Sequence, residues 1–189
     1  AETDGSPSSL EESCEAFLAQ RVEGIVRVSP VFQEVRPGPA LSSLPVVLAN
    51  AEAPRPGWAT VLADPAGAAR MATETLVDLG HVRVGLILPA TQTRASSCCE
   101  AGYREAILRS RRPSDSALVV AVPGAPMAPA RPPRPSVLRS LLSLSSPPTA
   151  LLCVGLDVAL QTLTELLSQG VAVPSEMSLL CITGDVEDG

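Results

Sequence analysis

Short apolar runs without polar alternation are the feature of this sequence that most narrows its possible folds. Seven such runs recur along the 189 residues, each rich in valine, isoleucine or leucine. A strand with one solvated face alternates apolar and polar residues, whereas a strand buried on both faces has a continuous apolar run. The runs therefore predict strands of a parallel sheet at residues 24–30, 44–50, 59–64, 82–89, 117–123, 149–155 and 177–183.

Helix-like segments lie between most of these runs. Residues 64–80 carry clear signals, because Asp64 can cap the helix, Pro65 suits its first turn and Gly80 can end it. Apolar spacing predicts further helices at residues 9–22, 98–110, 134–144 and 156–170. Strands that alternate with helices imply right-handed β-α-β units, so the sequence predicts an α/β fold with doubly wound parallel sheets.

Composition excludes several functions. All 14 basic residues are arginine, so a lysine Schiff base and a phosphate-binding loop with its lysine are both ruled out. The net charge of −6 makes a poor electrostatic match for nucleic acid. No apolar run reaches the length that spans a membrane. The sequence contains no dinucleotide fingerprint, nucleophile elbow or metal-ligand cluster, so we expect no enzyme activity, cofactor or metal.

The single histidine and the five cysteines give little sign of chemistry. His81 follows a helix stop and has no second histidine nearby, so we expect a turn residue that hydrogen-bonds to the backbone. The odd cysteine count without a C-x-x-C pair favours a reducing, cytoplasmic setting. Cys98 and Cys99 leave one alternative, a redox-sensing pair, because a thiol near a helix N-terminus can have a lowered pKa. Two small residues at a helix start is the simpler interpretation.

Six stretches, in order, resemble the lactose-repressor/galactose-repressor family of bacterial transcription regulators. The longest is residues 64–87, which is similar to the family's central signature of an Asp-initiated helix ending in L-G-H-x-x-I. The other five are "RVEGIVRVSP", "LPVVLAN", "EAGYREAI", "PPTALLC…DVAL" and "GVAVPSEMSLLCITGD". The resemblance covers roughly residues 9–188 and implies a periplasmic-binding-protein-like type I fold, in which two doubly wound subdomains enclose a small ligand.

The resemblance also implies how the chain is divided. Residues 1–63 would form a partial N-terminal subdomain of the effector-binding core, and residues 64–189 the C-terminal subdomain. The family's helix-turn-helix, its first β-α unit and its returning C-terminal segments have no counterpart here, so we expect a core that is incomplete at both ends. A partial subdomain leaves apolar faces uncovered, so we expect marginal stability or association.

The function that the resemblance implies is the ligand-sensing and dimerisation core of a cytoplasmic, non-enzymatic regulator. Its partners would be a sugar-like effector, a second copy in a homodimer, and DNA contacted only through a helix-turn-helix. Ligands of open parallel sheets bind beyond the carboxyl ends of the strands, where polar groups hold them. The candidate ligand-binding residues at these positions are Asp64, Thr91, Arg94, Cys99, Asp157, Thr183 and Asp185.

Several candidates depart from the family's pattern. Cys99 stands where the family has an arginine, which Arg94 could replace. Asp157 comes one place after the expected aspartate, and Thr183 stands where the first aspartate of a terminal pair is expected, with Asp185 nearby.

Asp64 alone fits the pattern, and helix capping already explains it. The alternatives are an unusual effector, a relative that no longer binds, or a periplasmic-type solute-binding protein of a transporter. The L-G-H turn is more typical of the regulators.

Overall fold

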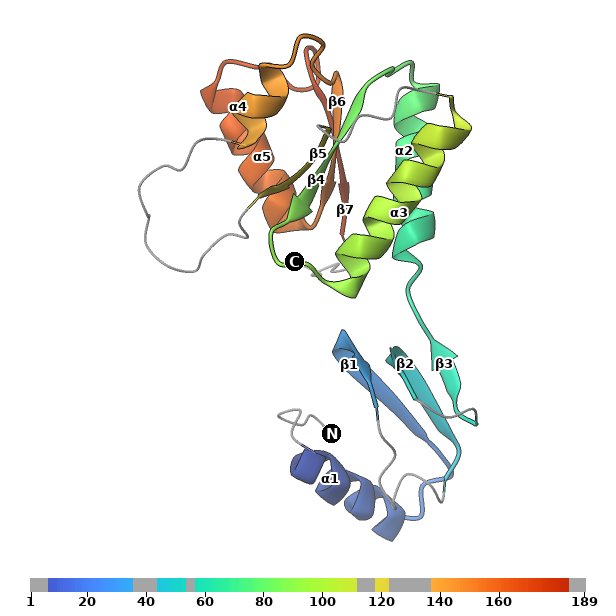
Figure 1. The fold of residues 1–189 in the computed structure, drawn as a ribbon. Coiled ribbons are helices and arrows are strands. Elements are labelled where there is room, and N and C mark those ends of the chain that lie inside the picture. Colours follow the sequence, from blue (N-terminus) through green and yellow to red (C-terminus); the bar gives the residue numbers. More distant parts are fainter. Residues whose placement is uncertain (1–6, 36–43, 54–56, 112–117, 123–136, 184–189) are drawn as a thin grey trace. The chain divides into compact units, whose positions relative to one another are not determined.

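The structure is a computed structural model that describes residues 7–35, 44–53, 57–111, 118–122 and 137–183. The side chains of residues 7–11, 30–33 and 137 lie outside this description, as does Asp185. The chain forms two compact units, Ala1–Ala63 and Asp64–Gly189. Each unit contains its own parallel sheet (Figure 1).

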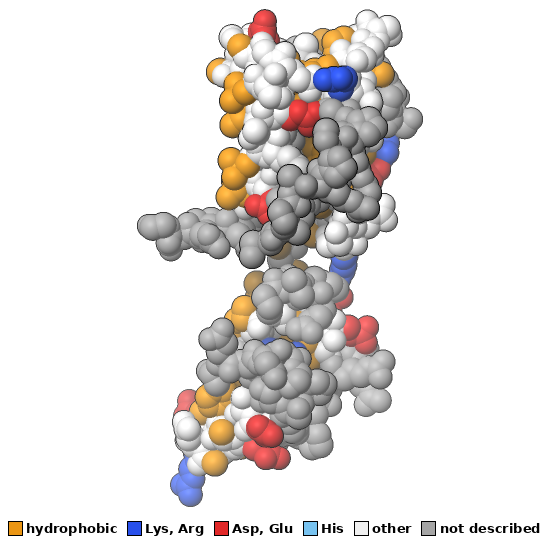
Figure 2. Space-filling model, turned by 90° about the vertical axis from the view of Figure 1, so that its left-hand side faces the viewer, with side chains coloured by type: hydrophobic (Ala, Val, Ile, Leu, Met, Phe, Trp, Pro, Cys, Tyr) orange, Lys and Arg blue, Asp and Glu red, His pale blue; other side chains and the backbone are white. Residues whose placement is uncertain are grey.

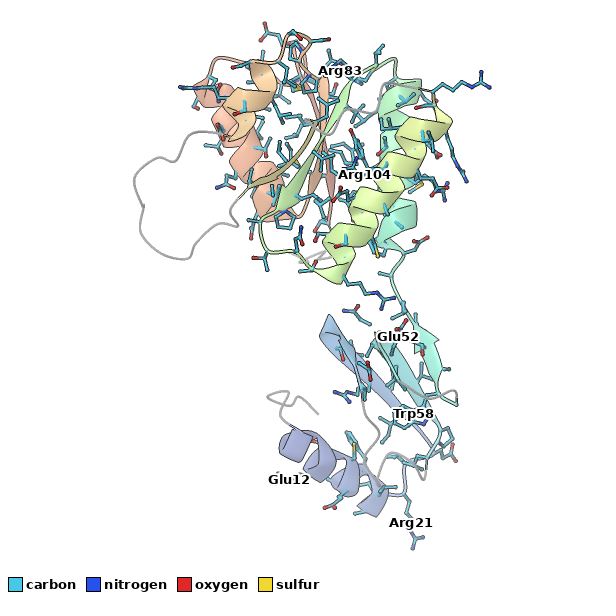
Figure 3. The ribbon with its side chains drawn as sticks, viewed as in Figure 1. Glu12, Arg21, Glu52, Trp58, Arg83 and Arg104 are labelled. Carbon is cyan, nitrogen blue, oxygen red and sulfur yellow. The ribbon has the colours of Figure 1, made fainter. Side chains whose placement is uncertain are left out.

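The first unit is a three-stranded parallel sheet with one helix. Helix α1 (Pro7–Ala19) is followed by β1 (Ile25–Glu34), β2 (Val46–Glu52) and β3 (Ala59–Val61), in the sheet order β1-β2-β3. Among the described residues, its buried hydrophobic side chains are Cys14, Val35, Val46, Leu48 and Ala51, and the partly buried Trp58, labelled in Figure 3, packs against them.

The opposite face of this sheet is apolar and open to solvent. Val26 of β1 is in register with Val47 of β2, and Val28 with Ala49, so these side chains share one face. Val26 and Val28 are 68% and 71% exposed. A parallel sheet is normally covered on both faces. The described strands of the first unit therefore leave apolar surface exposed on this face.

The second unit is a four-stranded parallel sheet between two pairs of helices (Figure 1). Its sheet order is β5-β4-β6-β7, and α2 and α3 cover one face while α4 and α5 cover the other. The predicted doubly wound parallel α/β fold is confirmed in this unit. In chain order the elements are α2 (Pro65–Asp78), β4 (Val84–Pro89), α3 (Arg94–Arg109), β5 (Val119–Val122), α4 (Val137–Leu142), β6 (Ala150–Val154), α5 (Leu156–Ser168) and β7 (Ser178–Ile182).

Strand β4 shows why the apolar runs lack alternation. Leu86 and Leu88 point into the cluster beneath α2 and α3, whereas Ile87, between them, belongs to the cluster beneath α4 and α5. Both faces of the strand are therefore buried. Tyr103 of α3 lies in the first cluster, and its hydroxyl donates a hydrogen bond to the carbonyl of Val84 at 2.7 Å.

Three expectations need correction. Strand β1 continues to Glu34, four residues beyond the end of the strand predicted at residues 24–30. Helix α3 begins at Arg94, four residues earlier than its apolar spacing indicated. His81 lies in the expected turn, but its imidazole Nδ1 is 2.9 Å from the hydroxyl of Thr149 rather than from a backbone group.

Candidate functional site

Four candidate residues of the second unit, Thr91, Arg94, Asp157 and Thr183, lie at one edge of its sheet. All four strands are parallel, so their carboxyl ends at Pro89, Val122, Val154 and Ile182 lie on the same edge. Arg83, labelled in Figure 3, precedes β4 and marks the opposite, amino edge. At the carboxyl edge, Thr91 and Thr183 follow β4 and β7, and Asp157 lies in the first turn of α5; all three are exposed.

This edge has a topological switch point between β4 and β6. The chain leaves β4 for α3 on one face of the sheet, and it leaves β6 for α5 on the other face. The two connections diverge, and open α/β sheets generally bind their ligands outside the carboxyl ends of the strands at such a switch point. Thr91 stands on one side of the switch point and Asp157 on the other.

The start of α3 is set by a capping box that the helical spacing missed. The Thr93 hydroxyl accepts a hydrogen bond from the backbone N–H of Ser96 at 3.1 Å, and the Ser96 hydroxyl accepts one from the N–H of Thr93 at 2.9 Å. These bonds satisfy two N–H groups at the helix terminus. Arg94 is consequently the first residue of the helix, and its side chain is exposed at the carboxyl edge.

A glycine shapes the other side of the switch point. Gly155 has a φ of 102°, a left-handed conformation that side chains rarely adopt, and its N–H donates to the carbonyl of Ile182 at 2.8 Å. Gly155 has no side chain that could cap α5. The negative charge that stabilises the N-terminus of α5 comes instead from Asp157 in its first turn. An exposed carboxylate at this position is also free to accept hydroxyl protons from a ligand.

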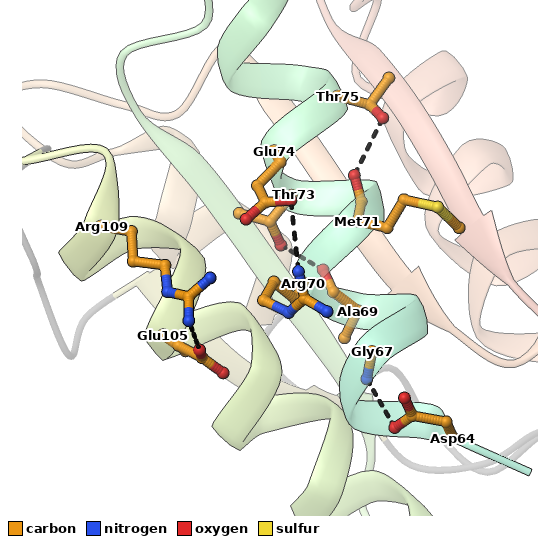
Figure 4. A network of polar contacts seen from close by, with 10 residues as sticks. All are labelled: Asp64, Gly67, Ala69, Arg70, Met71, Thr73, Glu74, Thr75, Glu105 and Arg109. Carbon is orange, nitrogen blue, oxygen red and sulfur yellow. Dashed lines mark hydrogen bonds and ion pairs between the residues drawn. The ribbon is translucent and has the colours of Figure 1, made fainter.

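Asp64 caps α2, as its sequence context indicated. Its Oδ1 accepts a hydrogen bond from the N–H of Gly67 at 2.8 Å (Figure 4). A surface depression of about 350 Å³ adjoins it, lined by Asp64, Ala66, Gly67, Arg70, Glu105 and Arg109. Arg109 pairs with Glu105 at 2.7 Å, and Arg70 lies 3.7 Å from Glu74. The charges in this depression largely neutralise one another.

Cys99 lies inside the protein, away from the exposed edge. Its side chain is 2% exposed, and its thiol donates to the carbonyl of Pro65 at 3.5 Å, between α2 and α3. Burial, with a smaller contribution from neighbouring Cys98, raises the pKa of Cys99 to about 11. A buried neutral thiol favours a packing role at this helix interface.

The described residues meet the requirements of neither a metal site nor a membrane-spanning helix. In this part of the chain, no three histidine, cysteine, aspartate or glutamate side chains cluster in a way that could hold a metal ion. Nor does any helix within it combine the length and apolar character needed to cross a bilayer.

Comparisons with known proteins agree with this architecture. Residues 73–187 match the family model of the periplasmic binding protein-like domain. The ribose operon repressor of Haemophilus influenzae is 23% identical over 188 residues, which cover 95% of this chain and 53% of the repressor. The transcriptional repressor CytR of Escherichia coli strain K12 is 29% identical over 136 residues, covering 72% of this chain and 38% of CytR.

Solved structures give the same fold. A LacI-family transcriptional regulator from Rhizobium etli superposes with a TM-score of 0.75 at 21% identity, over 95% of this chain and 64% of that one. The chain thus spans about half or less of the curated repressors that it matches. It belongs to the periplasmic binding protein-like domain family.

Proposed function

We propose that this chain is the effector-sensing core of a cytoplasmic LacI-type transcription regulator and that it binds a sugar-like molecule without catalysis. The observation that carries the proposal is the switch point, where exposed polar groups follow strands that end at one edge. Hydroxyl and charged side chains at this edge of the sheet suit a polyhydroxylated ligand. The relatives are named as repressors, which favours this function over solute transport.

The proposed contacts come from the carboxyl edge. Asp157 accepts ligand hydroxyl protons, Arg94 donates to ligand oxygens, and Thr91 and Thr183 add hydroxyls. Asp185 completes the set as a proposal from sequence alone. Asp64 and Cys99 have structural roles that account for them, so we assign them the smallest share of binding.

A thermal-shift screen and calorimetry test the proposal. Ribose, other sugars, phosphosugars and nucleobases serve as probes, and one of them is expected to raise the melting temperature. Asp157→Asn then weakens its binding roughly 10- to 100-fold, because a hydrogen bond to a charged group contributes about 1.5–3 kcal/mol. Asp78→Asn is the matched control, since Asp78 is an exposed carboxylate that ends α2 at the amino edge. Equal losses in both variants, or no response to any probe, would contradict the proposal.

The homodimer in this proposal uses the outer face of α5. Leu156, Leu160 and Leu167 are 52%, 53% and 57% exposed, and their spacing of four and seven residues places them on one stripe. Figure 2, which faces the α4–α5 side of the unit, shows hydrophobic side chains in a row on its surface. Exposed polar residues flank the stripe at Asp157 and Gln161. An uncharged stripe with a polar rim suits contact with its own copy across a two-fold axis.

Sedimentation measures this association. Leu160→Glu is expected to shift the chain toward monomer, because it places a charge in the centre of the stripe. Leu108→Glu on α3, where the wild-type leucine is 75% exposed, should leave the sedimentation coefficient unchanged. DNA contact, in this proposal, requires a helix-turn-helix outside these 189 residues.

A further inference from the structure

Two free cysteines face each other across neighbouring strands of the second unit. Cys153 of β6 and Cys181 of β7 are direct partners in the parallel register. Partners in a parallel ladder direct their side chains to the same face of the sheet. Both belong to the apolar cluster beneath α4 and α5, so the two thiols meet on that face.

The two thiols differ in access. Cys153 is fully buried, whereas Cys181 is only partly buried. Among the described strands β7 is the last in its sheet, with a neighbour on one side only. A small thiol reagent therefore reaches Cys181 first, and Cys153 lies behind it.

Strand spacing brings the pair within reach of a covalent bond. Neighbouring strands run about 4.7–4.9 Å apart. Disulfides join residues whose Cα atoms are typically about 4.4–6.8 Å apart, so the backbone separation is suitable. The Cβ atoms of a disulfide lie closer together, at about 3.8 Å, so the strands must adjust slightly and the bond is more easily reduced.

We propose that Cys153 and Cys181 form a reversible cross-strand disulfide, which makes this pair an oxidative modification site. The co-reactant is a small disulfide such as oxidised glutathione. The Cys181 thiolate attacks it, forming a mixed disulfide and releasing one glutathione thiolate. The Cys153 thiolate then attacks the Cys181 sulfur and releases the second glutathione, so two protein thiols are oxidised while one small disulfide is reduced.

The apolar surroundings of Cys153 and Cys181 favour the neutral thiols and the neutral disulfide over the charged thiolates. Burial raises the pKa of Cys153 to about 12, a shift that the Thr162 hydrogen bond partly offsets and nearby Cys181 increases. Burial also raises the pKa of Cys181. Thiolates are therefore scarce and the reaction is slow, whereas a disulfide carries no charge and is compatible with an apolar cluster.

The bond would lie directly below the proposed effector edge. Cys153 precedes Gly155 by two residues, and Cys181 precedes Thr183 by two. Drawing β6 and β7 together at this level shifts the loops that follow them. An effect of oxidation on effector affinity rests on the proposed function, whereas formation of the bond does not.

Peptide mapping under native conditions tests the bond itself. The chain is incubated with oxidised glutathione, alkylated and mapped by mass spectrometry without reduction. We expect a Cys153–Cys181 cross-link, which consumes two of the five thiols, with full recovery in excess reduced glutathione. Cys153→Ala should instead retain one glutathione on Cys181. A wild-type chain that carries only this single adduct would overturn the proposal.

A residue swap provides the matched control. Leu180 packs against the cluster on the opposite face of the sheet. Leu180→Cys combined with Cys181→Leu therefore keeps the composition and moves the thiol away from Cys153. This variant should form no cross-link to Cys153 while retaining a native far-UV circular dichroism spectrum. An equal cross-link in the folded swap variant would show that the bond does not depend on the register, and would also overturn the proposal.

Discussion

Gly102 shows how one residue sets the spacing of two helices. A Cβ atom added there would overlap the backbone carbonyl of Ala66, so α2 and α3 approach this closely only because residue 102 has no side chain. The family resemblance placed a glycine here, in the stretch "EAGYREAI", without indicating what lies against it. The structure supplies that reason.

Gly102→Ala is therefore expected to destabilise the second unit by about 1–3 kcal/mol, the usual cost of overpacking a core. Chemical denaturation measures the change. Gly85→Ala is the comparison variant. Its added methyl would meet the flexible end of the Leu151 side chain rather than backbone, so its loss of stability should be smaller. A Gly85→Ala cost equal to or above that of Gly102→Ala would contradict the packing argument.

The neighbouring thiols Cys98 and Cys99 are expected to differ in reactivity. Cys99 is buried with a pKa of about 11, whereas Cys98 is partly exposed. At pH 8 roughly one Cys99 in a thousand carries the thiolate. A maleimide should therefore label Cys98 more than tenfold faster, and labelling of Cys99 should rise as the pH increases. Equal rates at pH 8 would restore the hypothesis of a redox-sensing pair.

At the scale of the element, helix α3 depends on its first turn. The Thr93–Ser96 capping box positions Arg94 at the proposed effector edge. The apolar spacing began only at residue 98 because the first turn of the helix is polar and presents its side chains mainly to solvent. Caps are read from side-chain chemistry, and hydrophobic periodicity does not detect them.

Removing this cap should shorten the helix and weaken the unit. Thr93→Ala is expected to lower the free energy of unfolding by about 1 kcal/mol. Thr93→Ser keeps the hydroxyl and should preserve most of the stability. Thr75→Ala is the control, because Thr75 lies near the C-terminus of α2, where its exposed hydroxyl donates to the carbonyl of Met71 and caps no helix start. Equal losses in Thr93→Ala and Thr93→Ser would exclude capping as the cause.

At the scale of the whole molecule, the two units differ in how completely they bury their sheets. Helices cover both faces of the second sheet, whereas the first sheet has one covered face and one exposed apolar face. Exposed apolar surface of this kind promotes association. We therefore expect this open face to promote nonspecific aggregation, separately from the proposed dimer contact on α5.

Replacing valines on the open face tests this expectation. Val26→Thr with Val28→Thr keeps the shape and strand preference of both residues, and should reduce binding of the dye ANS and aggregation. Val46→Thr is the matched control on the buried face, where an unpartnered hydroxyl should instead cost about 1–3 kcal/mol of stability. Dye fluorescence and thermal unfolding distinguish the two effects. Unchanged ANS fluorescence in the double variant would show that the dye does not bind to the open face.

The sequence by itself determined the alternation of helices and parallel strands. A strand such as β4, buried on both faces, has to be apolar at every position, and helices need caps and apolar stripes, so both leave local patterns. Asp64 as a cap could be read in the same way, because its bond partner lies only three residues away.

Only the tertiary structure decided which distant residues meet. His81 bonds to Thr149, 68 residues later, and Cys99 to Pro65, 34 residues earlier. Cys153 faces Cys181 because two strands adopt one register out of several that their apolar residues would allow. Such contacts depend on how complete elements pack together, and no local pattern specifies this.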